Sequence, residues 1–440
     1  MLTRRGFLHS TFTAAALAPL TRLPALAAGE DYRALVCVFL FGGNDCHNTV
    51  VPLERQAYQS YQTSRGALAL SAQALLPIGG PGGAAYGLHP RLADLQRLYS
   101  EKRAAIIANL GLLVRPLTRD EYRQRSVPLP VNLFSHSDQQ LEWQWGSPAG
   151  SSRSGWGGRL ADSTPVRNLD PALAAVSLTG NTVFLSGEQV RPALVNMGAP
   201  TALTGFNSSR EQQARLRAFL EILAMDEPSR LVETARLKAA EGLRISETLT
   251  RVLSGPSPLK TPFPATTLGR QMEQIARLLR ARGELGASRQ VFFASLGGWD
   301  HHVSLVASQD ALMNQLGPAL GAFYRATEEL GLADRVTTFT ASEFGRTLNA
   351  NSNAGSDHGW GAHHFVIGGA VRGGVLYGTW PTVALNSPDD ATGRGVWIPT
   401  TSLDQYGATL AAWFGAPESE LARVFPNLGN FPAWNLGFMS

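Results

Sequence analysis

The chain alternates short apolar segments with longer stretches whose apolar residues recur at helical spacing. Each apolar segment is rich in Val, Leu, Ala or Phe and ends at a glycine, which is typical of buried strands in a parallel sheet. These segments are 33–43, 104–111, 172–180, 289–298 and 335–345. Helical spacing between them, as in 89–103 and 310–330, completes a strand–helix alternation. The pattern predicts an α/β fold, a three-layer α/β/α sandwich around a mostly parallel sheet.

Residues 208–285 differ from this alternation. They contain three amphipathic helical patterns whose polar faces are rich in arginine, with no strand pattern between them. We expect a helical insertion or side layer here, within one domain that runs from 28 to 440.

The N-terminal segment predicts export. Arg4 and Arg5 precede a weakly apolar stretch, and Ala25-Leu26-Ala27 offers small residues for cleavage. Paired arginines before a mild apolar core resemble a twin-arginine signal, so we exclude 1–27 from the fold and expect a periplasmic or secreted protein.

Charge gives no reason to expect a nucleic-acid partner, and hydropathy gives none to expect a membrane-spanning segment. Removing the three arginines of the predicted signal from the 38 basic residues leaves 35, against 34 acidic ones, so nothing favours nucleic acid. No apolar run after the signal reaches the roughly 18 residues that span a bilayer. The two cysteines, Cys37 and Cys46, are too few for a Cys₄ zinc site. Cys37 is expected in the core, and whether the two pair stays open.

Carboxylates and imidazoles follow the predicted strands. Ligands in an open α/β sheet bind beyond the carboxyl ends of its strands, so these side chains are candidates for one shared site. They are Asp45 and His47 after the first strand, Asp300, His301 and His302 after 289–298, Glu343 after 335–341, and Asp357 and His358 before the last strand.

Imidazoles and carboxylates without thiolates favour Zn²⁺, with Mn²⁺, Fe or Ca²⁺ as alternatives. Asp300 and His302 alternate, so both side chains can point the same way, which favours His302 over His301. His363 and His364 are adjacent, so their side chains face opposite ways at a strand start. We give His363 a supporting role and expect His364 to pack. The predicted metal ligands are Asp45, Asp300, His302, Glu343, Asp357, His358 and His363.

The predicted catalytic groups are Ser135, His136 and Arg346. Ser135 and His136 stand at the start of a predicted helix, where the helix dipole stabilises an alkoxide or an anion. Ser135 is either a nucleophile or the N-cap of that helix. Arg346 either binds a phosphate or sulfate through two hydrogen bonds or forms a salt bridge with Glu343 or Asp357.

Five motifs carry a resemblance that covers nearly the whole chain after the signal. They are FLFGGNDCHNTVVPL, FSHSDQQ, GGWDHH, SEFGRT and DHGWGAHHFVIGGAVRGG. They resemble a bacterial twin-arginine-exported family catalogued as a domain of unknown function, which is similar to the alkaline phosphatase and sulfatase superfamily.

The resemblance implies an alkaline-phosphatase-like sandwich with a two-metal centre that cleaves phosphate or sulfate esters through a covalent nucleophile. It gives Ser135 the role of nucleophile. It gives metal-ligand roles to Asp45, to Asp300 with His302, to Glu343 and to His358. Two features depart from the superfamily: its Asp-x-x-x-His pair is here Asp-x-His, and Ser342-Glu343 stands where alkaline phosphatases have Asp-His.

We therefore expect an exported metal-dependent hydrolase that uses a serine or a metal-bound water, acting on a small anionic ester or a polymer. The absence of the sulfatase signature Cys-x-Pro-x-Arg favours phosphate. The alternatives are a non-catalytic exported protein that binds metal or a partner, and a metal-dependent enzyme that cleaves a polysaccharide or another polymer.

Overall fold

The structure, a computed structural model, describes residues 31–147, 152–164, 168, 171–195, 209–225 and 229–440. The predicted signal, 1–27, lies outside the described residues. None of the helices in these ranges combines the length and the apolar character that a membrane crossing requires.

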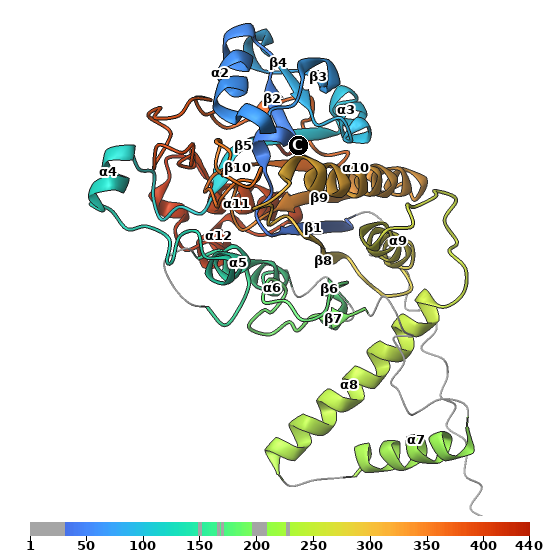
Figure 1. The fold of residues 1–440 in the computed structure, drawn as a ribbon. Coiled ribbons are helices and arrows are strands. Elements are labelled where there is room, and N and C mark those ends of the chain that lie inside the picture. The colour runs from blue at the N-terminus through green and yellow to red at the C-terminus, as the bar shows by residue number, and fades with distance from the viewer. Residues whose placement is uncertain (1–30, 148–151, 165–167, 169–170, 196–208, 226–228) are drawn as a thin grey trace, which may run out of the picture.

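The centre of the molecule is a nine-stranded sheet (Figure 1). Its order is β11-β5-β10-β9-β1-β8-β6-β7, with β12 pairing to β5. Every strand is parallel to β1 except β10, which runs antiparallel to both of its neighbours. The strands are β1 (Arg33–Phe41), β5 (Ala104–Gly111), β6 (Ala175–Ser177), β7 (Ala193–Leu194), β8 (Arg289–Gly297), β9 (Val336–Ala341), β10 (Ala362–Ile367), β11 (Leu376–Tyr377) and β12 (Thr401–Ser402). The mostly parallel sheet expected from the apolar segments is confirmed.

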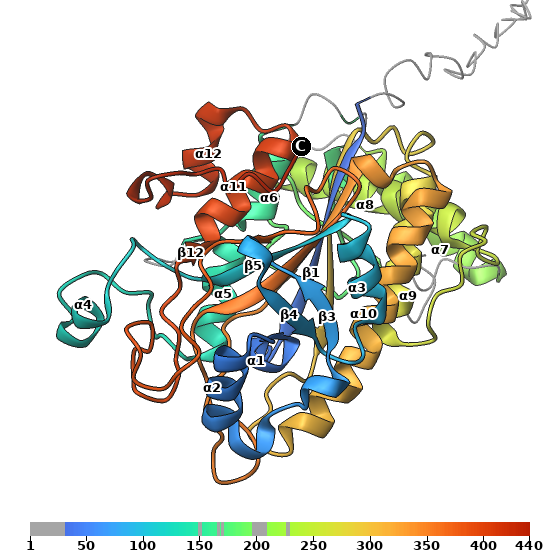
Figure 2. The same ribbon diagram turned by 90° about the horizontal axis from the view of Figure 1, so that it is seen from above.

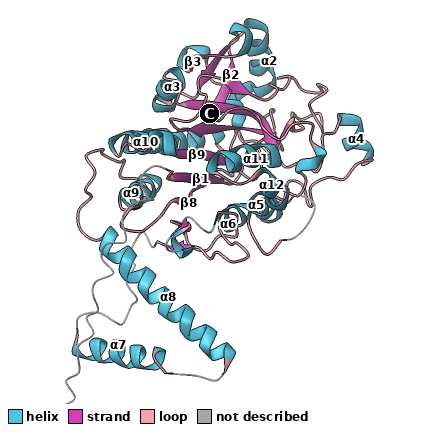
Figure 3. Cartoon of the chain, turned by 180° about the vertical axis from the view of Figure 1, so that it is seen from behind, coloured by secondary structure: helices cyan, strands magenta, loops and turns pink. Residues whose placement is uncertain are grey.

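Alternate side chains of the central strand β1 enter two separate cores. Val36 and Val38 face one core with α3 (Ala93–Ser100), α9 (Thr267–Arg280) and α10 (Leu305–Glu329). Leu35 and Cys37 face the other, with α6 (Trp156–Asp162), α11 (Leu403–Phe414) and α12 (Glu418–Val424). Figures 2 and 3 show the sheet between these two helical layers, which confirms the predicted sandwich. Cys37 and Cys46 are both free and buried.

The remaining elements surround this sandwich. A small antiparallel sheet of order β2-β4-β3 lies beside α1 and α2 near the start of the chain (Figures 1 and 2). Its strands are β2 (Val50–Pro52), β3 (Leu76–Gly79) and β4 (Ala85–Leu88), and the helices are α1 (Cys46–Thr49), α2 (Arg55–Arg65), α4 (Arg119–Gln124) and α5 (His136–Trp145).

The helices predicted in 208–285 are present. They are α7 (Arg210–Leu223), α8 (Arg230–Leu253) and α9. Only α9 packs closely against the sheet, through Leu268, Met272 and Ile275. Figure 1 shows α7 and α8 extending away from the sheet.

The loops after β1 and β8 are packed against each other. Gly42 has φ +120°, and a Cβ there would lie 2.4 Å from the backbone nitrogen of Asp300, so only glycine fits. This contact fixes the position of Asp300 relative to β1 at the carboxyl edge of the sheet.

A candidate metal centre

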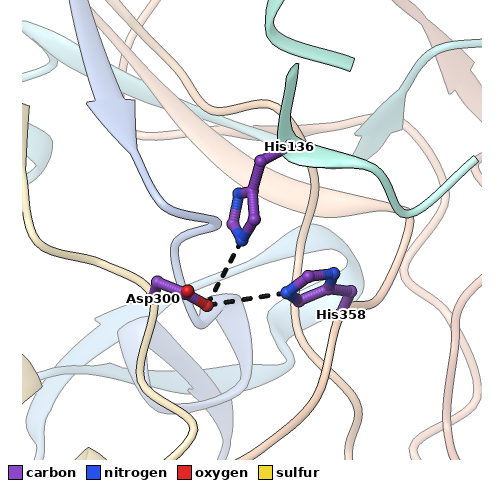
Figure 4. Close-up of side chains that lie close together, drawn as sticks. All are labelled: His136, Asp300 and His358. Atoms are coloured by element: carbon purple, nitrogen blue, oxygen red, sulfur yellow. Dashed lines mark ion pairs between the residues drawn. The ribbon is translucent and has the colours of Figure 1, made fainter. Parts of the chain in front are cut away.

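Three imidazoles surround the carboxylate of Asp300. Its Oδ1 lies 3.3 Å from His136 Nε2, 3.0 Å from His302 Nε2 and 3.5 Å from His358 Nε2. The ligand atoms of His136, Asp300 and His358 all lie within 4.8 Å of one another, and Figure 4 shows both rings pointing toward the carboxylate. His302 adjoins this group, because its Nε2 is 2.9 Å from His358 Nε2.

The second nitrogen of each imidazole has its own partner. Nδ1 of His136 lies 2.9 Å from Glu343 Oε1, and Nδ1 of His302 lies 3.2 Å from Asp357 Oδ1. Nδ1 of His358 donates to the carbonyl oxygen of Phe134 at 2.7 Å. A carbonyl only accepts, so the proton of neutral His358 is on Nδ1 and its Nε2 carries a free lone pair. Such contacts orient metal-ligating histidines and make them more basic.

The geometry fits a divalent cation. Zinc bound tetrahedrally at about 2.0–2.1 Å separates its ligand atoms by about 3.3–3.4 Å, and the distances from Asp300 to His136 and His358 bracket that value. Two neutral imidazole nitrogens 2.9 Å apart, as in His302 and His358, repel each other unless a proton or a cation lies between them. The donor set of nitrogen and carboxylate oxygen, without sulfur, is also the one that Zn²⁺ accepts.

Charges around the group keep Asp300 ionised. Burial by itself would raise the pKa of Asp300, but its hydrogen bond to Arg346 and the charge of Arg346 lower it to about 2. The hydrogen bond to Glu343 raises the pKa of His136, and burial lowers the pKa of His358. Asp300 therefore presents a carboxylate at neutral pH, as a metal ligand must.

His136 reaches the sheet edge because α5 begins there. Phe134 has φ +76°, which is uncommon for a residue with a bulky side chain, and this turn directs its carbonyl to His358. His136, the first residue of α5, then points to Asp300. Gln140, one turn later, donates to the same Oε1 of Glu343 that contacts His136. The start of α5 and the end of β9 are thus joined through Glu343.

Arg346 holds the loops of this edge together. Its buried guanidinium donates to the carbonyl oxygens of Gly42, Gly43, Trp299 and Ser356, and it forms an ion pair with Asp300. These acceptors occupy all three of its nitrogens. Of the two roles considered for Arg346, a salt bridge is the one present, but its partner is Asp300 and not the expected Glu343 or Asp357.

Of the four predicted ligands outside the group, Glu343 and Asp357 contact its histidines, while Asp45 and His363 have other partners. Asp45 is fully buried, caps α1 and forms an ion pair with Arg65, which is equally buried. His363 is stacked on Trp380 at 4.2 Å between ring centroids, and its Nδ1 accepts a hydrogen bond from the backbone of Asn109. His364 is buried and packs near Trp143. Both side chains therefore contribute to packing.

Ser135 stands next to the group. It is the N-cap residue of α5, but its side chain makes no capping bond. Its hydroxyl donates instead to Asp138 Oδ2 at 2.6 Å, in a partly buried position between the two residues that contact His358 and Asp300. A hydroxyl whose proton is directed at a carboxylate is suited to act as a nucleophile.

The sequence predicted a catalytic role for His136, which the structure places among the ligand atoms. Glu343 and Asp357, predicted as ligands, contact Nδ1 of His136 and Nδ1 of His302. The signal for His136 was its position at a helix start, two residues before Asp138 in FSHSDQQ. The local sequence pattern does not predict which strand end the start of α5 approaches.

Solved structures with a similar arrangement of the chain include three bacterial proteins. The C-terminal periplasmic domain of EptC from Escherichia coli shares 9% identity over 93% of this chain and 87% of its own, with a TM-score of 0.38. The PsFucS1 sulfatase from Pseudoalteromonas sp. shares 8% identity over 89% and 69%, with a TM-score of 0.35. The phosphonate monoester hydrolase of Agrobacterium radiobacter shares 11% identity over 88% and 74%, with a TM-score of 0.32.

The sequence itself gives the family. A search of curated proteins finds no match. A sequence model of one family, described as "Protein of unknown function (DUF1501)", matches residues 32–393, which is most of the chain and contains every residue of the candidate centre. The resemblance of the five motifs to a family of unknown function is thereby confirmed, and the chain belongs to the DUF1501 family.

Proposed function

We propose that this protein is a metal-dependent hydrolase of phosphate or sulfate esters, distantly related to the alkaline phosphatase and sulfatase superfamily. The observation that carries the proposal is the convergence of His136 Nε2, His358 Nε2 and the Asp300 carboxylate within 4.8 Å. The partners of both Nδ1 atoms orient the two rings toward Asp300. His302 adjoins the same group and completes the donor set.

A divalent ion held by these residues, with Zn²⁺ favoured by the donors, would polarise the ester and neutralise charge that develops on its oxygens. Glu343 and Phe134 keep the imidazoles of His136 and His358 in position. Arg346 holds Asp300 ionised and fixed to the loop after β1. The site is open to substrate, because the Asp300 side chain is 47% exposed.

Ser135 is the nucleophile in this proposal. As the serine oxygen forms its bond to phosphorus or sulfur, the hydroxyl proton passes to Asp138 Oδ2, with which it is already hydrogen-bonded, and the bond to the alcohol oxygen of the ester breaks. The alcohol leaves with a proton, and water then cleaves the seryl ester to release phosphate or sulfate and restore the hydroxyl. The backbone N–H groups at the start of the ten-residue helix α5 favour the anionic ester there. The absence of Cys-x-Pro-x-Arg favours phosphate over sulfate.

Export is a separate part of the proposal. The paired arginines at 4–5 and the small residues at 25–27 support a twin-arginine signal, and therefore a periplasmic or secreted enzyme in a single domain from 28 to 440.

The test uses the protein without residues 1–27. Bound metal is measured by elemental analysis, and aryl phosphates and aryl sulfates are screened for release of the aryl alcohol. We expect Ser135→Ala to lower kcat by about 10³-fold or more at unchanged metal content, because the nucleophile is lost while the ligands stay. Ser137→Ala is the matched control, because Ser137 neighbours the same hydroxyl at 3.2 Å and is expected to keep kcat within about threefold.

Two results would contradict the proposal. A metal-loaded protein that hydrolyses none of these esters would favour the non-catalytic metal-binding alternative. Equal activity of Ser135→Ala and the unmodified protein would remove Ser135 from the mechanism.

A further inference from the structure

A cavity of about 780 Å³ opens at the same edge of the sheet as the candidate metal centre. It lies at the carboxyl ends of β6, β7 and β8 and is closed on its other side by α9 and α10. Leucines form much of its wall, and the described residues that line it include no charged side chain. The lining residues include Leu178, Leu194, Leu296, Leu312, Gln271 and Gly297.

The cavity is close to Asp300 along the chain. Gly297 lines it, and Asp300 follows three residues later, so their Cα atoms are at most about 11 Å apart at 3.8 Å per residue. The segment between them is fixed, because the fully buried Trp299 donates its indole N–H to the carbonyl oxygen of Leu296 at 2.9 Å. An ester that extends over roughly this distance would therefore reach both the centre and the cavity.

The walls define what the cavity accepts. Gln271 is buried, and its amide is committed to the backbone of Ser295, to which it donates at 3.1 Å and from which it accepts at 2.9 Å. A charged group placed among Leu178, Leu296 and Leu312 would lose its hydration without gaining a partner. Cavities of roughly 300–1,000 Å³ with mainly apolar walls bind small organic groups.

We propose that this cavity binds the apolar organic part of the ester whose anionic head lies at the metal centre. This inference rests on the proposed hydrolase function and adds the substrate class: an amphiphilic ester, with a phosphate or sulfate on a long alkyl or fused-ring alcohol. A polysaccharide ester fits less well, because the polar side chains of the wall are fewer than its hydroxyls and four leucines would face the rest.

Binding is tested first, without turnover. The neutral fluorophore N-phenyl-1-naphthylamine is titrated into the protein, and we expect one saturable site with enhanced emission. Leu194→Asp should weaken its binding by about tenfold or more, because a carboxylate then faces the apolar group. Val375→Asp is the matched control, because Val375 and Leu194 are both 41% exposed and Val375 does not line the cavity.

Turnover is tested next with ethyl, butyl, hexyl and octyl phosphate, followed by release of inorganic phosphate. We expect kcat/KM to rise by about fourfold per methylene while the chain is being buried. The rise should disappear in Leu194→Asp and persist in Val375→Asp.

The outcomes separate the two proposals. Hydrolysis that is independent of chain length, with no saturable probe binding, overturns the cavity assignment and leaves the hydrolase proposal intact. Probe binding without hydrolysis of any ester overturns the hydrolase proposal and, with it, the role of the cavity in holding substrate. Equal effects of Leu194→Asp and Val375→Asp overturn the location of the binding site.

Discussion

Glu343→Gln is the sharpest test of the candidate centre. Glu343 is 1% exposed, and its Oε1 accepts three hydrogen bonds, from Gly42 N at 2.8 Å, from Gln140 Nε2 at 2.8 Å and from His136 Nδ1 at 2.9 Å. Glutamine keeps the shape and an oxygen acceptor for these donors. Its amide would face the hydroxyl of Ser342, which lies 3.3 Å from Oε2 and can accept as well as donate. The substitution therefore removes one negative charge and little else.

The expected magnitude follows from these bonds. A hydrogen bond to a charged group contributes about 1.5–3 kcal/mol, against about 0.5–1.5 kcal/mol for a neutral pair. Loss of charge at the His136 contact is therefore expected to weaken metal binding by about tenfold, the lower end of the 10- to 100-fold range for partners of metal-ligating histidines. Glu343→Ala would in addition leave all three donors without an acceptor and lower stability by about 1–3 kcal/mol for each.

The assay is competition for Zn²⁺ against a chromophoric chelator at pH 7, with thermal unfolding recorded for each variant. Glu142→Gln is the matched control, because Glu142 is 2% exposed and accepts hydrogen bonds from Val131 and Gln139 on the same helix region. Burial raises the pKa of Glu142 to about 8, so its side chain is mainly neutral at pH 7. Replacing it by the neutral amide of glutamine therefore changes the charge little. Unchanged zinc affinity in Glu343→Gln, or an equal loss in Glu142→Gln, would refute the role given to Glu343.

Two further predictions concern stability. Arg65→Met leaves the buried carboxylate of Asp45 without its partner and should lower the free energy of unfolding by about 3–5 kcal/mol in urea titrations; a loss below 1 kcal/mol would show that Asp45 does not depend on this pair. Burial raises the pKa of Asp404 from 3.8 to about 7. The protonated carboxyl therefore stabilises the folded protein fully below pH 3.8, and this stabilisation, about 4 kcal/mol, is lost as the pH rises through 7. Asp404→Asn should flatten the decline in unfolding free energy between pH 5 and pH 8, and an unchanged slope would contradict the buried, protonated state.

The sequence predicted the sheet well because its strands are buried on both faces. Every residue of β5 is buried, as are the seven central residues of β1, so both appear as unbroken apolar runs. The strand ends then located Asp300 and His302, since the carboxyl ends of parallel strands share one edge. His358 reaches the same edge because the strand that follows it, β10, runs antiparallel to its neighbours. The structure brings these three side chains together.

What the sequence could not predict depends on contacts between distant segments. Asp45 follows β1 as a strand-end acid should, but Arg65, twenty residues later, returns to pair with it inside the protein. His136 reaches Asp300 only because the turn at Phe134 directs the start of α5 onto the sheet. Neither the pairing partner of a carboxylate nor the approach of a helix start is encoded in local periodicity.

These placements argue for one principal metal position. Among the described residues, the ligand atoms close enough to hold an ion gather at one place: they belong to His136, Asp300 and His358, and His302 adjoins them. Carboxylates that would serve a second ion are engaged elsewhere: Asp45 pairs with Arg65, and Glu343 and Asp357 contact the Nδ1 atoms of His136 and His302. The acidic residues at these strand ends therefore act by orienting imidazoles. On this reasoning metal affinity depends on Glu343 through His136, while Asp45 contributes to stability.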